Sequence, residues 1–329
     1  MSIRPFLRAG VCALTLGVAV LACTAALAQW KPERPVKLMV GFAPGGSADT
    51  LARLIAEPLG QKLGQPVIVE NVPGAGGNIM AQRLSTSPAD GYTLGMGAAG
   101  SMSVAFHRSP QATKYRPESF APLTLLASQP NVVIVNNHMP ASSIQELKSY
   151  IQKHPQASYG IAGIGISNHL IAESMLNRLG VKMQAVAYKG AAPVISDLLG
   201  GHIMMTVDNI TTAAALAKEG KVKALAVTTA KRAPQLPDVP TLQEQGLKNF
   251  DMPTWQGLFA PAGLPADMLK TYFQAVQEVL NDPATREKMA LLGSEPVVGV
   301  SSAAFVKYLA KDRQQWADTI KAAGIVDTP

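Results

Sequence analysis

Phe42–Asp49 reads F-A-P-G-G-S-A-D, and Pro73–Asn78 reads P-G-A-G-G-N. Each stretch follows a short apolar run, Val36–Val40 or Val67–Val69, and precedes a helical pattern, so each predicts a tight turn from a strand into a helix. Glycine lets the backbone adopt positive φ and approach a ligand closely. The helix start that follows offers unpaired N–H groups and a partial positive charge. Together the two turns predict a backbone cradle for a small anion such as a carboxylate.

Apolar β-rich runs alternate with helical patterns along the rest of the chain, which indicates an α/β fold with mostly parallel strands. The runs that we expect to be strands are 36–41, 67–70, 93–97, 132–135, 157–162, 185–188, 203–207, 222–229 and 255–259. The segments that we expect to be helices are 48–63, 77–87, 142–153, 167–179, 191–199, 210–219, 265–281, 283–292 and 302–323.

The length of the chain predicts two lobes, because it exceeds what one small hydrophobic core usually holds. We expect residues 29–130 together with 255–329 to form the first lobe, and residues 131–254 to form the second. The chain would cross between the lobes near 125–133 and 252–260, as in a clam-shell. Ligands of open α/β sheets bind at the carboxyl ends of strands, which is where both glycine turns lie.

Residues 1–28 have the pattern of a secretory signal peptide. Arg4 and Arg8 form a positive start, an apolar run follows, and Ala26-Leu27-Ala28 is a small-x-small cleavage site before Gln29. A membrane anchor and a lipoprotein start at Cys23 are the alternatives, but the cleavage site and the shortness of the apolar run favour export. We therefore expect a periplasmic protein without this segment.

Composition narrows the classes of function. Cys12 and Cys23 are the two cysteines of the chain and both lie in the signal segment, so the mature chain would have no disulfide, thiolate nucleophile or cysteine metal site. Removing Arg4 and Arg8 lowers the net charge from +7 to +5, since residues 1–28 contain no acidic residue. This excess suits an anionic ligand, but it is too dispersed for a nucleic-acid surface.

Motifs for catalysis and for cofactors do not coincide with the glycine turns. Neither turn has the G-x-G-x-x-G pattern of dinucleotide sites, and the dispersed histidines predict no metal site. Ser167, His169 and Asp208 have the residue types of a hydrolase triad, but Ser167 and His169 are two residues apart at a helix start and would not face each other. We expect no enzyme, no catalytic residue, no metal and no cofactor.

An ordered set of motifs resembles one family over essentially the whole mature chain. Besides the two glycine turns, the motifs are D-G-Y-T-L (90–94), A-Y-K-G-A-A-P (187–193), D-L-L-G-G (197–201), V-D-N (207–209), A-L-A-V-T-T-A-K-R (224–232), L-P-D-V-P-T (236–241), W-Q-G-L-F-A-P-A-G (255–263) and E-P-V (295–297). The chain resembles the Bug family, the periplasmic receptors of tripartite tricarboxylate transporters. The resemblance implies a two-lobed Venus-flytrap fold that captures a small carboxylated metabolite.

The resemblance also implies which residues contact the ligand. In the first lobe they are Phe42, Gly45, Gly46, Asp49, Gly77 and Asn78. In the second lobe they are Ser167, Asn168, His169, Tyr188 and Asp208. Structural roles remain alternatives for several of them: Ser167 as the N-cap of helix 167–179, Asp49 as a helix-start residue, His169 as a packing residue, and Tyr188 and Asp208 as loop anchors.

The chain departs from the family pattern at three places. Met80 stands where the family often has glycine, and the loop Ala98–Ser101 lacks a common asparagine. In the second lobe, Gly163–Leu170 reads G-I-G-I-S-N-H-L, so that Ile166 replaces a hydroxyl side chain and makes the pocket more apolar. These departures leave the identity of the ligand open.

Three hypotheses of function follow. The first is a monomeric receptor that delivers a small carboxylate to an inner-membrane tripartite tricarboxylate transporter permease. The second is the same receptor acting as a sensor for a two-component histidine kinase. The third is a periplasmic hydrolase of small esters or amides that uses Ser167.

Overall fold

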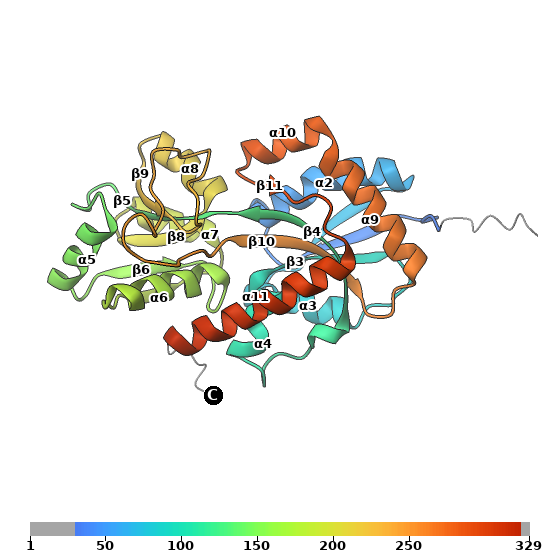
Figure 1. The fold of residues 1–329 in the computed structure, drawn as a ribbon, viewed down its shortest axis with the longest axis horizontal. Coiled ribbons are helices and arrows are strands. Elements are labelled where there is room, and N and C mark those ends of the chain that lie inside the picture. Colours follow the sequence, from blue (N-terminus) through green and yellow to red (C-terminus); the bar gives the residue numbers. More distant parts are fainter. Residues whose placement is uncertain (1–29, 324–329) are drawn as a thin grey trace, which may run out of the picture.

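The computed structural model describes residues 30–323, which form two β-sheets flanked by helices (Figure 1). The predicted signal peptide lies outside the described residues, so the expectation of export by cleavage after Ala28 stays a prediction. We call the part built on the first sheet the first lobe and the part built on the second sheet the second lobe. The lobe boundaries expected from the sequence, residues 29–130 with 255–329 and residues 131–254, stay predictions.

The first sheet has six strands in the order β11-β4-β10-β3-β1-β2. They are β1 (Val36–Val40), β2 (Val67–Asn71), β3 (Thr93–Ala98), β4 (Phe120–Gln129), β10 (Thr254–Pro261) and β11 (Glu295–Pro296). Strand β1 pairs in parallel with both β2 and β3. The carboxyl ends of these three strands therefore meet at one edge of the sheet, as the glycine turns require.

The second sheet has five strands in the order β7-β6-β8-β5-β9. They are β5 (Asn131–Asn136), β6 (Ser158–Ile161), β7 (Gln184–Ala187), β8 (Met205–Asn209) and β9 (Val222–Val227). Strand β6 pairs in parallel with β7 and β8, and β5 pairs antiparallel with β8 and β9.

The two-lobed α/β class is confirmed, with one correction to the strand directions. The sequence predicted mostly parallel sheets, whereas five of the nine strand pairings among the described residues are antiparallel. The strands that cross between the lobes cause the difference. Strand β4 continues into β5 with only Pro130 between them, and β10 returns from the second lobe antiparallel to both β3 and β4.

Helices cover both sheets. The longer ones are α2 (Ser47–Leu63), α3 (Asn78–Ser85), α5 (Ile144–Lys153), α6 (Ser167–Leu179), α7 (Ala191–Leu199), α8 (Ile210–Lys218), α9 (Ala266–Asn281), α10 (Pro283–Leu291) and α11 (Ser302–Ala323). The short ones are η1 (Ala75–Gly77), η2 (Gly100–Val104), α4 (Ala105–Arg108) and η3 (Pro117–Ser119). Helix α2 buries Leu51, Ile55 and Leu59 against the sheet, as their spacing predicts.

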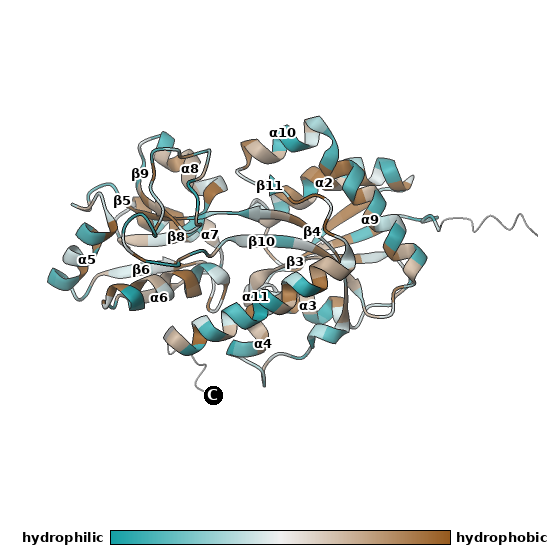
Figure 2. Cartoon of the chain, viewed as in Figure 1, coloured by the Kyte–Doolittle hydropathy of each residue, from teal (hydrophilic) through white to brown (hydrophobic). Residues whose placement is uncertain are grey.

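Helix α11 lies across both lobes (Figure 1). It contacts β4, η2 and α4 of the first lobe and α6 of the second. Its buried face is Phe305, Leu309, Trp316 and Ile320, and Figure 2 shows brown and teal residues mixed along its length, as expected for a helix with one buried face. No helix within residues 30–323 is long and apolar enough to cross a membrane.

Candidate functional site

The first glycine turn joins β1 to α2 and is held by a buried carboxylate. Asp49, whose exposed fraction is 3%, accepts hydrogen bonds from the Gly45 N–H (2.9 Å), from Arg53 Nε (3.0 Å) and from Asn71 Nδ2 (2.8 Å). Burial alone would raise the pKa of Asp49, but these bonds outweigh it and lower the pKa. The Asp49 carboxylate and the Gly45 N–H are thus engaged with each other, which favours a supporting role for Asp49 over direct ligand contact.

The start of α2 leaves backbone donors without a side-chain cap. Gly46 is the N-cap residue, with φ −79° and ψ 167°, and no side chain accepts a hydrogen bond there. A helix start of this kind presents N–H groups that an anion can accept. The N–H groups that follow Gly46 are therefore a candidate position for a carboxylate.

The second glycine turn joins β2 to α3 and meets the first turn at Gly77. Gly77 has φ +95°, and a Cβ built there would lie 3.5 Å from Ser101 Oγ and 3.7 Å from Phe42 Cε2. Asn78 follows, and its Oδ1 accepts a hydrogen bond from the Tyr115 hydroxyl (2.8 Å). Phe42, Gly77 and Asn78 are thus brought together with the loop after β3, while their contact with a ligand stays a prediction.

The end of β3 and the residues after it contain a G-x-G-x-x-G string at residues 95–100, which sequence reasoning overlooked. A Cβ at Gly95 would lie 2.5 Å from Leu84 Cδ2, and one at Gly97 would lie 2.6 Å from Phe259 Cε2. These two glycines make room for buried side chains, so the string is explained by packing and indicates no nucleotide site.

In the second lobe, the loop Gly163–Ile166 leads from β6 into α6. Ile166 is the N-cap residue of α6 and no side chain within residues 30–323 caps the helix, so the alternative role of Ser167 as N-cap is wrong, while its contact with ligand stays a prediction. Ser167 is the first helical residue, is 6% exposed, and its Oγ donates to Asn168 Oδ1 (3.3 Å). Asn168 Nδ2 in turn donates to the carbonyl of Val207 (3.1 Å), which ties α6 to β8. The N–H groups of this helix start have no side-chain cap among the described residues, as at the start of α2.

His169 supports the same loop. Its Nδ1 accepts the N–H of Gly165 (3.0 Å), and its Nε2 lies 4.0 Å from Glu173 Oε1. Burial, together with the positive charge of Arg108, lowers the pKa of His169 to about 4, so the imidazole is neutral near pH 7. No hydrogen bond joins Ser167 Oγ to His169 in the described part of the chain, and the relay that a serine hydrolase needs is not formed.

Tyr188 and Asp208 differ in how they are satisfied. The Tyr188 hydroxyl donates to Asp197 Oδ2 (2.6 Å), and this bond raises the pKa of Tyr188 to about 12. Asp208 Oδ1 accepts the N–H of Asn209 (2.9 Å), whereas Oδ2 is buried without a hydrogen-bond partner among the described residues. Burial raises the pKa of Asp208 to about 6. The Tyr188 hydroxyl thus has a structural partner, while Asp208 Oδ2 at the end of β8 is without one among the described residues.

The two lobes contact each other where these loops meet. Asn209 Nδ2 donates to Ser47 Oγ at the start of α2 (3.0 Å). A Cβ at Gly76 would lie 2.9 Å from Ile166 Cγ2, and one at Gly100 would lie 3.6 Å from Ile166 Cα. Sequence reasoning missed Ser47, Gly100 and Asn209 as interlobe residues, although Asn209 belongs to the V-D-N motif that it singled out.

The raised pKa of Asp208 predicts how the free energy of unfolding depends on pH. The pKa of Asp208 is about 6 in the folded state and 3.8 in the unfolded state, so between these pH values the folded state binds more protons than the unfolded state. The stability that Asp208 contributes is therefore lost as the pH rises from 3.8 through 6. The loss amounts to about 3 kcal/mol. We expect Asp208→Asn to raise the free energy of unfolding at pH 7 and to give no gain near pH 4, as measured by urea unfolding.

The control for this prediction is the difference between variant and parent at each pH. His169 has the opposite dependence, since its lowered pKa removes stability as the pH falls from 6.5 towards 4, but it does so in both proteins. An Asp208→Asn variant that is equally or less stable than the parent at pH 7 would contradict the assignment of a buried charge.

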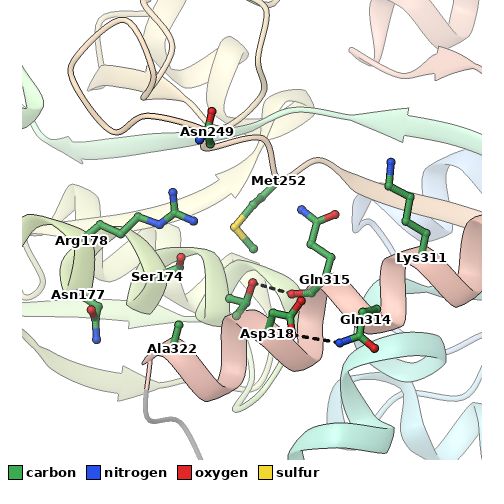
Figure 3. Close-up of a pocket in the computed structure, with 11 residues that line it drawn as sticks. Ser174, Asn177, Arg178, Asn249, Met252, Lys311, Gln314, Gln315, Asp318 and Ala322 are labelled. Carbon is green, nitrogen blue, oxygen red and sulfur yellow. Dashed lines mark hydrogen bonds between the residues drawn. The ribbon is translucent and has the colours of Figure 1, made fainter.

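A separate cavity of about 530 Å³ lies between α6 and α11, away from the glycine turns (Figure 3). Arg178 and Lys311 lie on opposite sides of it, with Met252 between them. The Arg178 guanidinium donates to the Lys248 carbonyl (3.2 Å) and lies 5.0 Å from the centre of the Phe250 ring. The Arg178 guanidinium thus already has partners within the protein, and the region where the glycine turns meet the loop Gly163–Ile166 remains the candidate site.

Residues 51–325 match the model of the tripartite tricarboxylate transporter family receptor. The chain belongs to this family. Members of the family are binding proteins for small solutes rather than enzymes. Two predictions from the sequence, the family and the fold, are therefore confirmed.

Solved structures similar to this receptor agree with that assignment. The periplasmic binding protein BugD is 36% identical, with a TM-score of 0.85, and the match covers 90% of this chain and 100% of that one. Rpa4515 of R. palustris, solved with adipate, is 34% identical with a TM-score of 0.85, covering 90% and 99% of the two chains. MatC of Rhodopseudomonas palustris, solved with bound malate, is 32% identical with a TM-score of 0.83, covering 88% and 99%.

Proposed function

We propose that this receptor captures a small carboxylate between its lobes in the periplasm and delivers it to the inner-membrane permease of a tripartite tricarboxylate transporter. One observation carries the proposal. Within residues 30–323, two helices of opposite lobes, α2 and α6, begin without side-chain caps, and both begin at residues that make contact between the lobes. Two uncapped helix starts close to one interlobe contact suit a ligand with negative charge.

In this mechanism the ligand acts by binding the closed form better than the open form. A carboxylate held at Gly46 and Gly77 would bridge to the start of α6, so closure adds contacts that the open form lacks. The permease would then recognise the closed arrangement of the two lobes. The similar proteins that were solved with adipate and malate support a carboxylate, and the apolar side chain of Ile166 favours a ligand with an apolar segment.

Thermal-shift screening of the mature protein tests the proposal. The panel comprises dicarboxylates, hydroxy acids, amino acids and aromatic acids, with neutral sugars and divalent metals as controls. A ligand at a hundred times its dissociation constant should stabilise the protein by about 2.7 kcal/mol. We expect at least one small acid, and no sugar or metal, to raise the melting temperature. A shift with a neutral sugar and none with any acid would contradict the carboxylate assignment.

A further inference from the structure

Arg108 of the first lobe lies directly over Gly165 of the second. It is the last residue of α4, and its side chain is only partly exposed. A Cβ built at Gly165 would lie 1.7 Å from Arg108 Nη1 and 2.6 Å from Arg108 Cζ. The guanidinium therefore occupies the space that any side chain at position 165 would need. Gly165 also has φ +76°, a conformation that L side chains rarely adopt.

The part of the loop that Arg108 contacts is fixed to the helix behind it. The N–H of Gly165 is hydrogen bonded to His169 Nδ1, and Arg108 is close enough for its charge to help lower the pKa of that histidine. The next residue, Ile166, is the one that meets Gly76 and Gly100 of the first lobe. Arg108 thus contacts the loop one residue before the N-cap of α6, where we place the ligand.

We propose that Arg108 is a positioning residue for ligand binding, which holds the loop Gly163–Ile166 against the first lobe when the lobes close. The inference rests on the proposed function, because it concerns the closure of that site. The planar guanidinium is weakly hydrated and rigid, so it can pack flat on a glycine backbone where a lysine ammonium could not. Since the contact joins the two lobes, moving them apart would break it, and it would contribute to the free energy of closure.

A contact of this kind affects affinity through the population of the closed form. The apparent dissociation constant rises as the fraction of competent protein falls. Removing Arg108 should therefore weaken every ligand by the same factor, whatever its chemistry. A residue that touches the ligand would instead change the order of preference among ligands.

The first experiment measures closure without any ligand. Both natural cysteines lie in the predicted signal segment, so spin labels on a Gln82→Cys and Lys153→Cys pair report alone in the mature chain. These exposed positions lie on α3 and α5, one in each lobe. We expect Arg108→Ala to shift the interlobe distances towards longer values, Arg108→Lys to do so in part, and the exposed first-lobe control Arg116→Ala to leave them unchanged. Distances identical in Arg108→Ala and the parent would overturn the proposal.

The second experiment measures affinity for adipate and malate by calorimetry. We expect Arg108→Ala to weaken whichever of these acids binds, and both equally if both bind, by roughly tenfold. A Gly165→Ala variant should also bind weakly, and the double variant no more weakly than Gly165→Ala alone, because the collision with Arg108 is then gone. Penalties that simply multiply in the double variant would show that the two residues act independently and would overturn the proposal.

The distance and affinity measurements separate failure of the proposed function from failure of the role of Arg108. If neither adipate nor malate binds, nor any acid of the screening panel, the proposed function fails while the distance measurement still decides the role of Arg108. If acids bind the parent and Arg108→Ala alike, the proposed function stands and the positioning role fails.

Discussion

Replacing Gly46 with valine is expected to abolish ligand binding while the protein stays folded. The backbone at Gly46 has φ −79° and ψ 167°, a region that valine adopts without strain. A Cβ there would have only the Ala43 carbonyl oxygen nearby, at 3.7 Å, so the fold has room for a side chain. The added methyl groups would instead cover the uncapped start of α2, where we place the carboxylate.

Calorimetry with the best acid from the screening panel measures the effect, and circular dichroism and the melting temperature check the fold. Gly46→Ala serves as the graded control, because its smaller side chain should weaken binding less than valine does. Parent-like affinity in Gly46→Val would mean that the first turn does not hold the ligand. A large drop in melting temperature would mean that the backbone, rather than the ligand, needs glycine at this position.

Replacing Asp49 with alanine is expected to lower the free energy of unfolding by about 2–3 kcal/mol and to weaken binding as well. The substitution removes the acceptor for the Gly45 N–H and leaves Arg53 and Asn71 without their shared partner. The first turn would lose the group that fixes its shape. Urea unfolding and calorimetry on the same preparation give both quantities.

A surface pair provides the matched control for Asp49. Glu278 bonds Lys62 at 2.8 Å, but both side chains are well exposed, so Glu278→Ala should cost far less than Asp49→Ala and leave affinity unchanged. Equal costs for the two substitutions would refute the supporting role of Asp49. A variant of Asp49 that is unstable yet binds normally would show that the turn keeps its shape without the carboxylate.

Local patterns predicted most of the elements, because each of them has its own signature in sequence. The alternation of apolar runs and helical spacing placed β1, β2, α2 and α6 within a residue or so of their observed bounds. The helical segment Gly100–Arg108 was missed, since its glycine and serines have no helical signature and its shape depends on packing against α11. Strand direction was misjudged in the same way, because direction is set by distant partners such as β4 and β10.

The candidate site likewise has features that the local sequence predicts and contacts that it does not predict. The glycine turns of the first lobe could be predicted because positive φ and a helix start are local properties. The contacts between the lobes could not, since Ser47 and Asn209, or Arg108 and Gly165, are far apart in sequence and have no common motif. His169 and Tyr188 were assigned to the ligand from a resemblance, whereas their hydrogen bonds to Gly165 and Asp197 give each a structural partner. Their contact with ligand stays a prediction.

Helix α11 has a mechanical consequence for the receptor. It is bonded to the first lobe through Trp255 Nε1 to Asp312 Oδ2 (3.0 Å) and Arg313 Nε to the Met102 carbonyl (3.1 Å), and its later turns pack on α6. If the lobes rotate, α6 must therefore move relative to α11, which is fixed to the first lobe. The contact between α6 and α11 thus restrains the rotation more than the crossing strands β4 and β10 would alone. The angle between the lobes in the empty receptor, and with it the free energy that a ligand must supply to close them, would then depend partly on the packing of α11 against α6.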